Sequence, residues 1–257
     1  MDFGLQTYTI RDLQKKDMDA AYRMVADIGL KYLEVARIKF NRENAERVKS
    51  ITEKYGLKVM SVQVKPKQVF GDVDGVVEFC KITGCKNVVI SMLPFECILG
   101  SDEKFYAFVK KLDRQTEIYA KHGLTLAYHH HNWEYIKLQS EPCRMDVLLR
   151  DTEKIMFVHD TYWSARSGIS PDVQIKRFGD RLLGVHLRDL DFKKKLLDVI
   201  PIDAPIGRGV IDFSKVLSAC DDVGCAYYVI EQNSRDPKSD LIFSLASLRK
   251  IFVLNKS

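Results

Sequence analysis

The sequence predicts an α/β protein built as a single-domain (β/α)8 barrel, and three observations lead to this fold class. One helix-to-strand junction recurs five times along the chain. Eight short apolar runs alternate with helical patterns, the order expected of parallel strands joined by crossover helices. The length of 257 residues is close to what one α/β barrel uses, and no linker-like or low-complexity segment divides it.

The recurring junction consists of a helical tail, a glycine and an apolar run. A glycine suits the left-handed position that follows a helix, and the runs are rich in β-branched or aromatic residues. The first three glycines are 27 and 28 residues apart, the length of one βα unit with short connections. The five junctions are ADIGLKYLEV at Gly29, EKYGLKVMSV at Gly56, KITGCKNVVI at Gly84, AKHGLTLAYH at Gly123 and DDVGCAYYVI at Gly224.

The strands follow in order from the apolar runs. The N-terminal run gives the first, the five junctions give the second to fifth and the eighth, and KIMFVHD and RLLGVHLRD give the sixth and seventh. Helical patterns such as NRENAERVKSITEKY follow most of them. A doubly wound open sheet is the alternative, but no G-x-G-x-x-G follows the first strand. The predicted strands are residues 2–8, 31–37, 57–64, 86–92, 124–131, 154–160, 182–188 and 226–231.

Composition excludes several classes of protein. The chain is 46% hydrophobic and 29% charged, which is ordinary for a globular protein and excludes disorder, collagen and fibres. The net charge of +5 is small and the charges are interspersed, so we expect no nucleic-acid partner. The one dense basic run, at 193–195 between Asp191 and Asp198, is interpreted as a solvated loop or helix face.

Cysteine usage and the N-terminal segment predict a cytoplasmic protein. The six cysteines form no CxxC pair, and a chain of this length needs no disulfides to fold. MDFGLQTYTIRDLQ lacks the basic and apolar regions of a signal peptide, and no apolar stretch approaches the roughly 18 residues of a membrane span. We therefore expect no membrane partner, and leave homo-oligomerisation open.

Polar residues gather where the predicted strands end, which is the face of such a barrel that carries chemistry. Strands five to eight are neighbours in a closed barrel, so His129, Asp160, His186 and Glu231 should converge. His131 shares the face of His129, since side chains alternate along a strand. Two imidazoles and two carboxylates suit one divalent metal ion of borderline hardness, Mn²⁺, Zn²⁺ or Co²⁺. The alternative for each residue alone is a hydrogen-bonded core side chain.

Seven motifs are spread over essentially the whole chain: GLQTYTIRD, GLKYLEV, LAYHHHNWEY, VHDTYW, GVHLRD, PIGRGVIDF and YYVIEQ. In order and spacing they resemble the sugar phosphate isomerase/epimerase family, the xylose isomerase-like TIM barrels. The resemblance implies one divalent metal held by Glu, Asp, His and Glu at four successive strand ends, the last three falling on Asp160, His186 and Glu231. His129 stands where the first glutamate is expected, as in the branch with a Tyr-His-x-His motif. The first ligand is therefore open among His129, His131 and Glu134.

The resemblance implies a divalent-metal-dependent isomerase or epimerase that acts on a ketose, keto-sugar or related polyol through an enediolate. The candidate proton-transfer pair is Glu231 and His131, with Glu134 as a further candidate base. For Arg188, an ion pair with Asp189 or Asp191 is the alternative to a substrate contact. The candidate substrate contacts are Gln6, Glu34, Trp163, Arg188 and Arg208.

Other activities stay open alongside this one. The YHHH segment also resembles the inosose dehydratase branch, so a metal-dependent dehydratase or lyase of a keto-sugar or keto-inositol is the alternative, and a non-catalytic sugar-binding barrel is another. The glycines of PIGRGVIDF precede a predicted helix and could hold an anion, so a phosphorylated substrate is left open. Abasic-site endonucleases share this barrel but need three metals, and the ligand count and modest charge argue against that activity.

Overall fold

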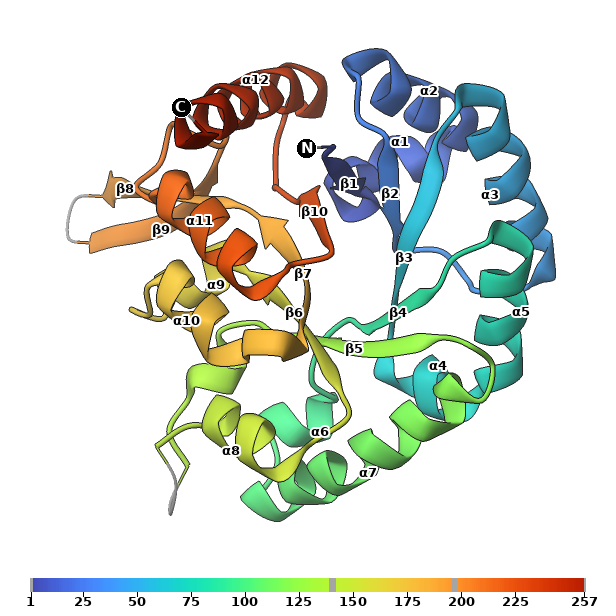
Figure 1. Ribbon diagram of the computed structural model, residues 1–257, viewed down its shortest axis with the longest axis vertical. Helices are drawn as coiled ribbons and strands as arrows, with labels where there is room; N and C mark the ends of the chain where they lie inside the picture. The colour runs from blue at the N-terminus through green and yellow to red at the C-terminus, as the bar shows by residue number, and fades with distance from the viewer. Residues whose placement is uncertain (1, 139–141, 196–197, 257) are drawn as a thin grey trace.

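The computed structural model describes residues 2–138, 142–195 and 198–256 and shows a closed barrel of eight parallel strands (Figure 1). Around the barrel the order is β1, β10, β7, β6, β5, β4, β3, β2. The predicted (β/α)8 class is confirmed, and every predicted strand overlaps one of these. The barrel strands are β1 Gly4–Gln6, β2 Tyr32–Val35, β3 Lys58–Val64, β4 Asn87–Ile90, β5 Thr125–His129, β6 Met156–Asp160, β7 Leu182–Leu187 and β10 Tyr227–Ile230.

Helices form the outer layer of the barrel. Local sequence fixes where several of them begin: Asp17, Asn41 and Asp72 accept N–H hydrogen bonds from the first turns of α2, α3 and α5. The helices are α1 Arg11–Lys16, α2 Met18–Ile28, α3 Arg42–Tyr55, α4 Pro66–Gly71, α5 Val73–Thr83, α6 Phe95–Ile98, α7 Asp102–Ala120, α8 Arg144–Asp151, α9 Thr161–Arg166, α10 Pro171–Phe178, α11 Phe213–Val223 and α12 Pro237–Lys256, with 3₁₀ turns at Thr7–Ile10, Trp133–Tyr135 and Gly179–Arg181.

The glycine junctions end helices as predicted, because all five glycines have positive φ. At Gly224, for example, φ is 72° and the backbone N–H reaches back to the carbonyls of the last turn of α11. A side chain would be strained there, so the glycine lets the chain leave the helix and enter the next strand within a few residues.

The basic run at 193–195 lies in neither a loop nor a helix, which corrects the interpretation above. It belongs to β8 (Asp189–Lys195), which pairs antiparallel with β9 (Asp198–Ala204) as a two-stranded sheet beside the barrel. Leu190 and Phe192 alternate with charged residues, which is the pattern of a strand. The density of basic residues at 193–195 obscures this pattern in the sequence. In Figure 1 this hairpin projects from the barrel next to α11.

Two apolar layers support the barrel. A small cluster fills its interior, and a much larger one lies between the strands and the helices. Gly184 on β7 belongs to the inner layer, because a Cβ there would lie 2.4 Å from the ring of Tyr227. The interior cluster consists of Val89, Ala127, Val158, Leu183, Tyr227 and Val229.

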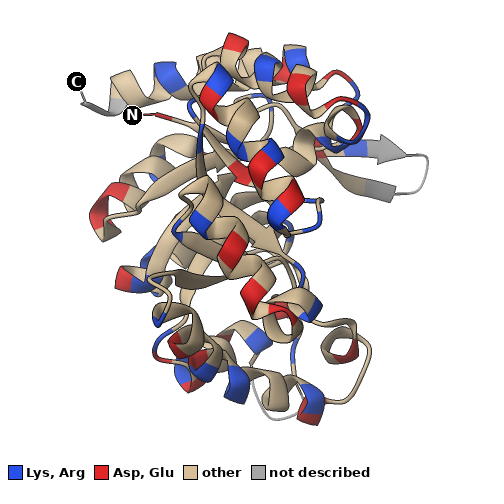
Figure 2. Ribbon diagram, turned by 90° about the vertical axis from the view of Figure 1, so that its right-hand side faces the viewer, with Lys and Arg blue, Asp and Glu red and all other residues tan. Residues whose placement is uncertain are grey.

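Charged side chains of both signs are mixed along the outer helices in the view of Figure 2, as the sequence pattern predicted. Within the described residues, no helix is long and apolar enough to cross a membrane. The six cysteines are free thiols, four of them buried.

Candidate metal centre and cavity

Four side chains from neighbouring strands meet at the carboxyl end of the barrel. His129 ends β5, Asp160 ends β6, His186 lies on β7, and Glu231 directly follows β10. All four are buried, and one ligand atom from each lies within 4.8 Å of the others. The predicted convergence therefore exists in the fold, because parallel strands bring their last residues to one face.

The ligand atoms of this cluster lack ordinary partners. His129 places Nδ1 3.1 Å from the Ser91 carbonyl, which leaves Nε2 facing Asp160 Oδ2 at 3.5 Å. Among the described residues, His129 Nε2, both ring nitrogens of His186 and Glu231 Oε2 are buried without a hydrogen bond. Buried polar atoms are rarely left so, and an imidazole–carboxylate set of this kind fits a divalent ion. Asp160 also accepts a hydrogen bond from Trp163 N–H at the start of α9.

Glu34 holds His186 from behind. Its Oε1 lies 2.6 Å from His186 Nε2, while its Oε2 accepts hydrogen bonds from Ser61 and Tyr227 at 2.6 and 3.2 Å. No hydrogen bond joins Glu34 Oε1 to His186 Nε2, and because His186 is charged the contact is an ion pair. His186 therefore turns Nδ1 toward Glu231 Oε2, 2.9 Å away. An outer carboxylate that orients a ligand histidine is common in metal sites.

The electrostatics of the cluster favour charged carboxylates and a charged His186. Burial raises the pKa of Glu231, but Arg188 and His186 outweigh it and lower the pKa to about 2. Burial lowers the pKa of His186, yet the facing Glu34 and Glu231 raise it to about 10. The pKa of Asp160 lies below its usual range because Arg188 and His129 outweigh its burial.

Arg188 places a second cation at the cluster. Its Nη1 lies 3.2 Å from both Asp160 Oδ2 and Glu231 Oε1, and its Nη2 lies 2.7 Å from Asp203 on β9. The guanidinium stacks over Tyr162 and Trp163, 4.7 and 5.3 Å from the ring centroids. Its partners are thus buried cluster carboxylates and Asp203 rather than Asp189 or Asp191, which corrects the alternative considered from sequence.

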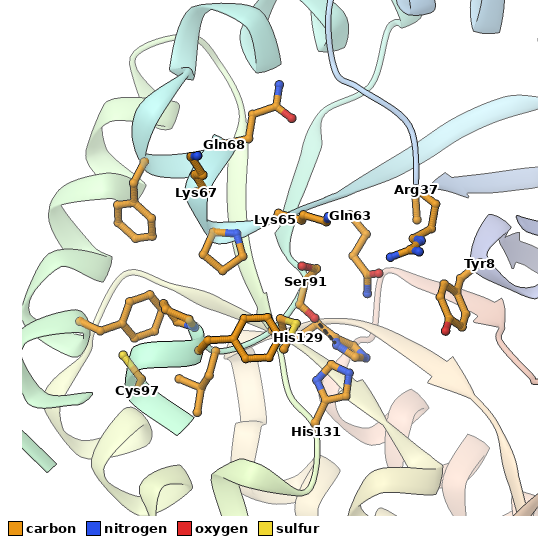
Figure 3. A pocket seen from close by; sticks show the side chains of 18 of the residues that line it. Tyr8, Arg37, Gln63, Lys65, Lys67, Gln68, Ser91, Cys97, His129 and His131 are labelled. Atoms are coloured by element: carbon orange, nitrogen blue, oxygen red, sulfur yellow. Dashed lines mark hydrogen bonds between the residues drawn. The ribbon is translucent and has the colours of Figure 1, made fainter. Parts of the chain in front are cut away.

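A cavity of about 1400 Å³ opens above the cluster. His129, Glu231 and Arg188 lie in its wall together with Gln6 and Trp163, whereas Asp160 and His186 lie behind that wall. His131 also lines it, 4.8 Å from His129 and 5.2 Å from Trp163 between ring centroids (Figure 3). Its Nδ1 is buried without a hydrogen-bond partner in the described part of the chain, and burial keeps its pKa well below the usual value.

Comparison with known proteins decides the family. The profile of the xylose isomerase-like TIM barrel family matches residues 22–251, which is most of the chain. The chain is a xylose isomerase-like TIM barrel. The expected resemblance is thereby confirmed.

Individual relatives of this xylose isomerase-like barrel have several activities. An inosose dehydratase of Geobacillus thermodenitrificans is 25% identical over 150 residues, 53% of this chain and 49% of the relative. The alignment thus spans about half the length of that curated relative. A sugar phosphate isomerase/epimerase from Parabacteroides distasonis has the same fold, with a TM-score of 0.79 at 18% identity over 96% of this chain and 93% of that one. A xylose isomerase-like barrel of Mycobacterium smegmatis in complex with magnesium has a TM-score of 0.74 at 9% identity, over 100% and 98% of the two chains.

Two residues that the sequence placed at the site of this xylose isomerase-like barrel lie elsewhere. The Glu134 carboxylate accepts hydrogen bonds from Tyr128 O–H and from His131 N–H, and it does not line the cavity. Arg208 is exposed and stacks on Phe243, 4.1 Å from the ring centroid. Glu134 therefore shapes the backbone that carries His131, and Arg208 does not contact the cavity.

The glycine-rich segment PIGRGVIDF, which by its sequence could hold an anion, binds a carboxylate of the chain itself. The backbone N–H groups of Gly207, Gly209 and Ile211 donate to the Asp189 carboxylate at 2.9, 2.9 and 3.2 Å. The expected ligand site is thus filled by an internal carboxylate, which ties this segment to the start of β8.

Sequence reasoning missed a histidine pair behind the cluster of the xylose isomerase-like barrel. His130 Nε2 lies 2.9 Å from His159 Nδ1 and accepts a hydrogen bond from Asp160 N–H at 3.1 Å. His159 in turn contacts Ser164 Oγ at 3.3 Å. Alternation along β5 and β6 put both imidazoles on the opposite face from His129 and Asp160, and that signal could have identified them as supports for the cluster.

Proposed function

We propose that this xylose isomerase-like barrel is a divalent-metal-dependent isomerase or epimerase of a ketose, keto-sugar or related polyol. The observation that carries the proposal is the convergence of His129, Asp160, His186 and Glu231, whose buried ligand atoms include several without a hydrogen bond among the described residues, next to a large cavity that His129 and Glu231 line. The mixed set of two imidazoles and two carboxylates suits Mn²⁺, Zn²⁺ or Co²⁺ as the single ion.

The chain's residues divide the work as follows. His129, Asp160, His186 and Glu231 would hold a divalent ion, which would supply Lewis-acid polarisation of a substrate carbonyl and so acidify the neighbouring C–H. Glu231 lies in the cavity wall as a carboxylate and can take that proton. His131 lies on the same wall as a neutral imidazole and can hold or return a proton. Trp163 covers the site on the side of His131 and keeps water out.

Arg188 serves substrate orientation in this proposal. The guanidinium lines the cavity while pairing with Asp160 and Glu231, so it can bind a substrate oxygen next to the ligand set. Gln6 adds an amide to the same wall, held by Gln63 at 2.8 Å. These groups fix which carbon of a polyol faces Glu231.

A metal-dependent dehydratase of a keto-sugar or keto-inositol is the second candidate. Two observations favour it: curated relatives include an inosose dehydratase, and an imidazole, His129, lies in the cavity wall together with the cluster carboxylate Glu231. Both activities begin with the same proton abstraction. They separate at the product, because dehydration yields an unsaturated ketone that absorbs in the ultraviolet, whereas epimerisation conserves mass.

The test combines metal content with isotope exchange. We expect about one equivalent of Mn, Zn or Co by elemental analysis and metal-dependent incorporation of solvent deuterium into a ketose. Asp160→Ala should lose the metal, and Glu231→Gln should lose exchange at least a hundredfold because it removes both a metal ligand and the base. Glu96→Gln, a carboxylate in the cavity wall away from the cluster, should keep both. A folded protein that takes up none of the three ions would refute the proposal.

A further inference from the structure

We propose that the substrate carries an anionic group, a phosphate or a carboxylate, at the end remote from the reacting carbon. This inference rests on the proposed function for one point only, the position of the reacting carbon beside Glu231. It concerns the wall of the same cavity over β2 and β3, which lie across the closed barrel from β6 and β7, the strands of Asp160 and His186.

Cationic side chains far outnumber acidic ones in the wall of the cavity. Besides Arg188, six cationic side chains line it, whereas the acidic side chains are Glu96 and the cluster residue Glu231. Arg37 follows β2 and Lys65 follows β3, so both stand at the mouth where strands end. The six are Arg37, Lys39, Lys65, Lys67, Lys104 and Lys111.

Within the described residues, the cations over β2 and β3 have no carboxylate at ion-pair distance. Arg188 pairs with three carboxylates, but the ion pairs found among the described residues include none for Arg37, Lys39, Lys65 or Lys67. A concave surface lined with unpaired charges of one sign concentrates the electrostatic potential and attracts ligands of the opposite sign.

The backbone at Arg37 is held in an unfavourable conformation. Its φ is 63°, in the left-handed region that residues with side chains seldom occupy. The preceding Ala36 is fixed on both sides, because its N–H donates to Thr7 Oγ1 at 2.9 Å and its carbonyl accepts from Gln14 Nε2 at 2.9 Å. The fold thus enforces the strain, and the side chain lies over the Tyr8 ring at 5.6 Å in the cavity wall.

Neutral polar groups separate the two walls. Figure 3 shows Gln63 and Ser91 between the histidines and the cationic side of Arg37 and Lys65. Amide and hydroxyl groups suit the hydroxyls of a polyol. A volume of about 1400 Å³ exceeds the roughly 300–1000 Å³ of common ligand sites, so an extended chain with a charged end has room.

The basic surface continues past the cavity rim. A second cavity of about 390 Å³ shares Arg37 and Lys39 with the first and adds Arg11, Lys15 and Arg47, against one acid, Asp12. The unpaired charge therefore belongs to a continuous rim over β1 to β3, and Arg37 stands where the two cavities meet.

Binding of matched sugars to the metal-loaded protein tests the inference. We would titrate D-fructose, D-fructose 6-phosphate, 5-keto-D-gluconate and inorganic phosphate by calorimetry. At least one anionic probe should bind ten times more tightly than fructose, and the better of the two charged sugars distinguishes phosphate from carboxylate. That preference should shrink as salt screens the charges.

Charge-removing variants locate the effect. Arg37→Gln and Lys65→Gln should each weaken binding of the preferred anionic probe roughly tenfold while leaving fructose unchanged. Lys110→Gln is the matched control, since Lys110 is exposed on α7 beside Lys111 but does not line the cavity. The inference is overturned if no anionic probe binds more tightly than fructose, or if Lys110→Gln has the same effect as the two cavity variants.

The result is independent of the proposed reaction. Tight anion binding that depends on Arg37 and Lys65, without metal-dependent deuterium exchange, would support the inference and count against the proposed function. Metal-dependent deuterium exchange on ketoses, without tighter binding of anionic sugars, would support the proposed function and overturn the inference.

Discussion

Arg188 adds a fixed positive charge to the cluster of His129, Asp160, His186 and Glu231. Its guanidinium is buried and touches two of the four ligand residues at 3.2 Å. A divalent ion at the cluster must share those carboxylates with a fixed positive charge, and like charges in a buried site repel strongly. Arg188 therefore compensates the carboxylates in the metal-free protein, and we expect it to weaken binding of a divalent ion.

Replacing Arg188 by glutamine should tighten metal binding. We expect roughly a tenfold lower Kd for Mn²⁺ by calorimetry, together with a lower Tm of the metal-free protein because Asp160, Glu231 and Asp203 lose their cation. Arg166→Gln is the control, since Arg166 also stacks on Trp163 at 5.3 Å but contacts none of these carboxylates. An unchanged or weaker affinity in Arg188→Gln would contradict the compensating role.

Metal binding should release a proton from His186. With a pKa of about 10, this imidazole is charged at pH 7.5 in the metal-free protein, and a ligand imidazole must be neutral. Calorimetric titrations in buffers of different ionisation enthalpy should report release of about one proton. Glu34→Gln should reduce that number, because it removes a carboxylate that raises the pKa of His186. Equal heats in all buffers would contradict this account.

The same pKa sets a direction for stability against pH. Because His186 has a higher pKa in the fold than when exposed, its charge stabilises the metal-free protein fully below about pH 6.5. That contribution is lost as the pH rises toward 10. The free energy of unfolding of the metal-free protein, measured in urea, should fall over this range by more than that of His186→Gln.

At the scale of elements, Gly184 on β7 allows the Tyr227 ring on β10 to pack closely against β7. Gly184 leaves room for the Tyr227 ring, and the Tyr227 hydroxyl donates to Glu34, which in turn holds His186. The packing of Tyr227 against Gly184 is thus linked to His186 of the cluster through the side chains of Tyr227 and Glu34. The strands deliver ligands to one face, and this inner layer fixes how they point.

Gly184→Ala should destabilise the protein by about 1–3 kcal/mol, because its Cβ would overlap the Tyr227 ring and force a shift. Urea unfolding measures this. Gly71→Ala is a suitable comparison, since a Cβ there meets nothing within 4 Å and the backbone needs no positive φ. Equal stability changes for the two variants would show that the tight fit at Gly184 is relaxed at no cost.

For the whole molecule, the sequence predicts the barrel and the convergence of the cluster well. Glycine junctions and apolar runs are local signals, and parallel strands necessarily carry their ends to one face. The directions of side chains in the loops that follow the strands are harder to predict from the sequence. The 3₁₀ turn at Trp133–Tyr135 turns Glu134 back onto the His131 N–H, and nothing in spacing encodes that.

Long-range pairings account for the other failures. The hairpin of β8 and β9 supplies Asp203 to Arg188, and residues 207–211 supply N–H groups to Asp189. Each contact joins residues 15 to 22 positions apart through a turn in the chain, so the glycine motif alone does not show that Asp189 accepts hydrogen bonds from its N–H groups.

Bound metal should stabilise the entire barrel, since its ligands come from four strands that unfold together. Free ion at a hundredfold excess over Kd contributes about 2.7 kcal/mol. For a chain of this size each kcal/mol raises Tm by about 2–4 °C, so addition of Mn²⁺ to metal-free protein should raise Tm by several degrees and chelator should reverse it. Asp160→Ala should show no such shift, and a shift of equal size in this variant would place the ion elsewhere.

The tie between Asp189 and the segment at 207–211 has a consequence for how this protein can change. Asp189 pairs with Ala204, so the chain leaves the barrel and returns to it at one point, and the Asp189 carboxylate closes that point against the following segment. We expect the excursion between Asp189 and Ala204 to tolerate changes in length or sequence without disturbing the barrel strands. Asp203 is the exception, since it reaches inward to Arg188. A hairpin of different length that keeps Asp189 and Asp203 would change how far the chain extends from the barrel. The contacts of Arg188 at the cluster would then stay the same.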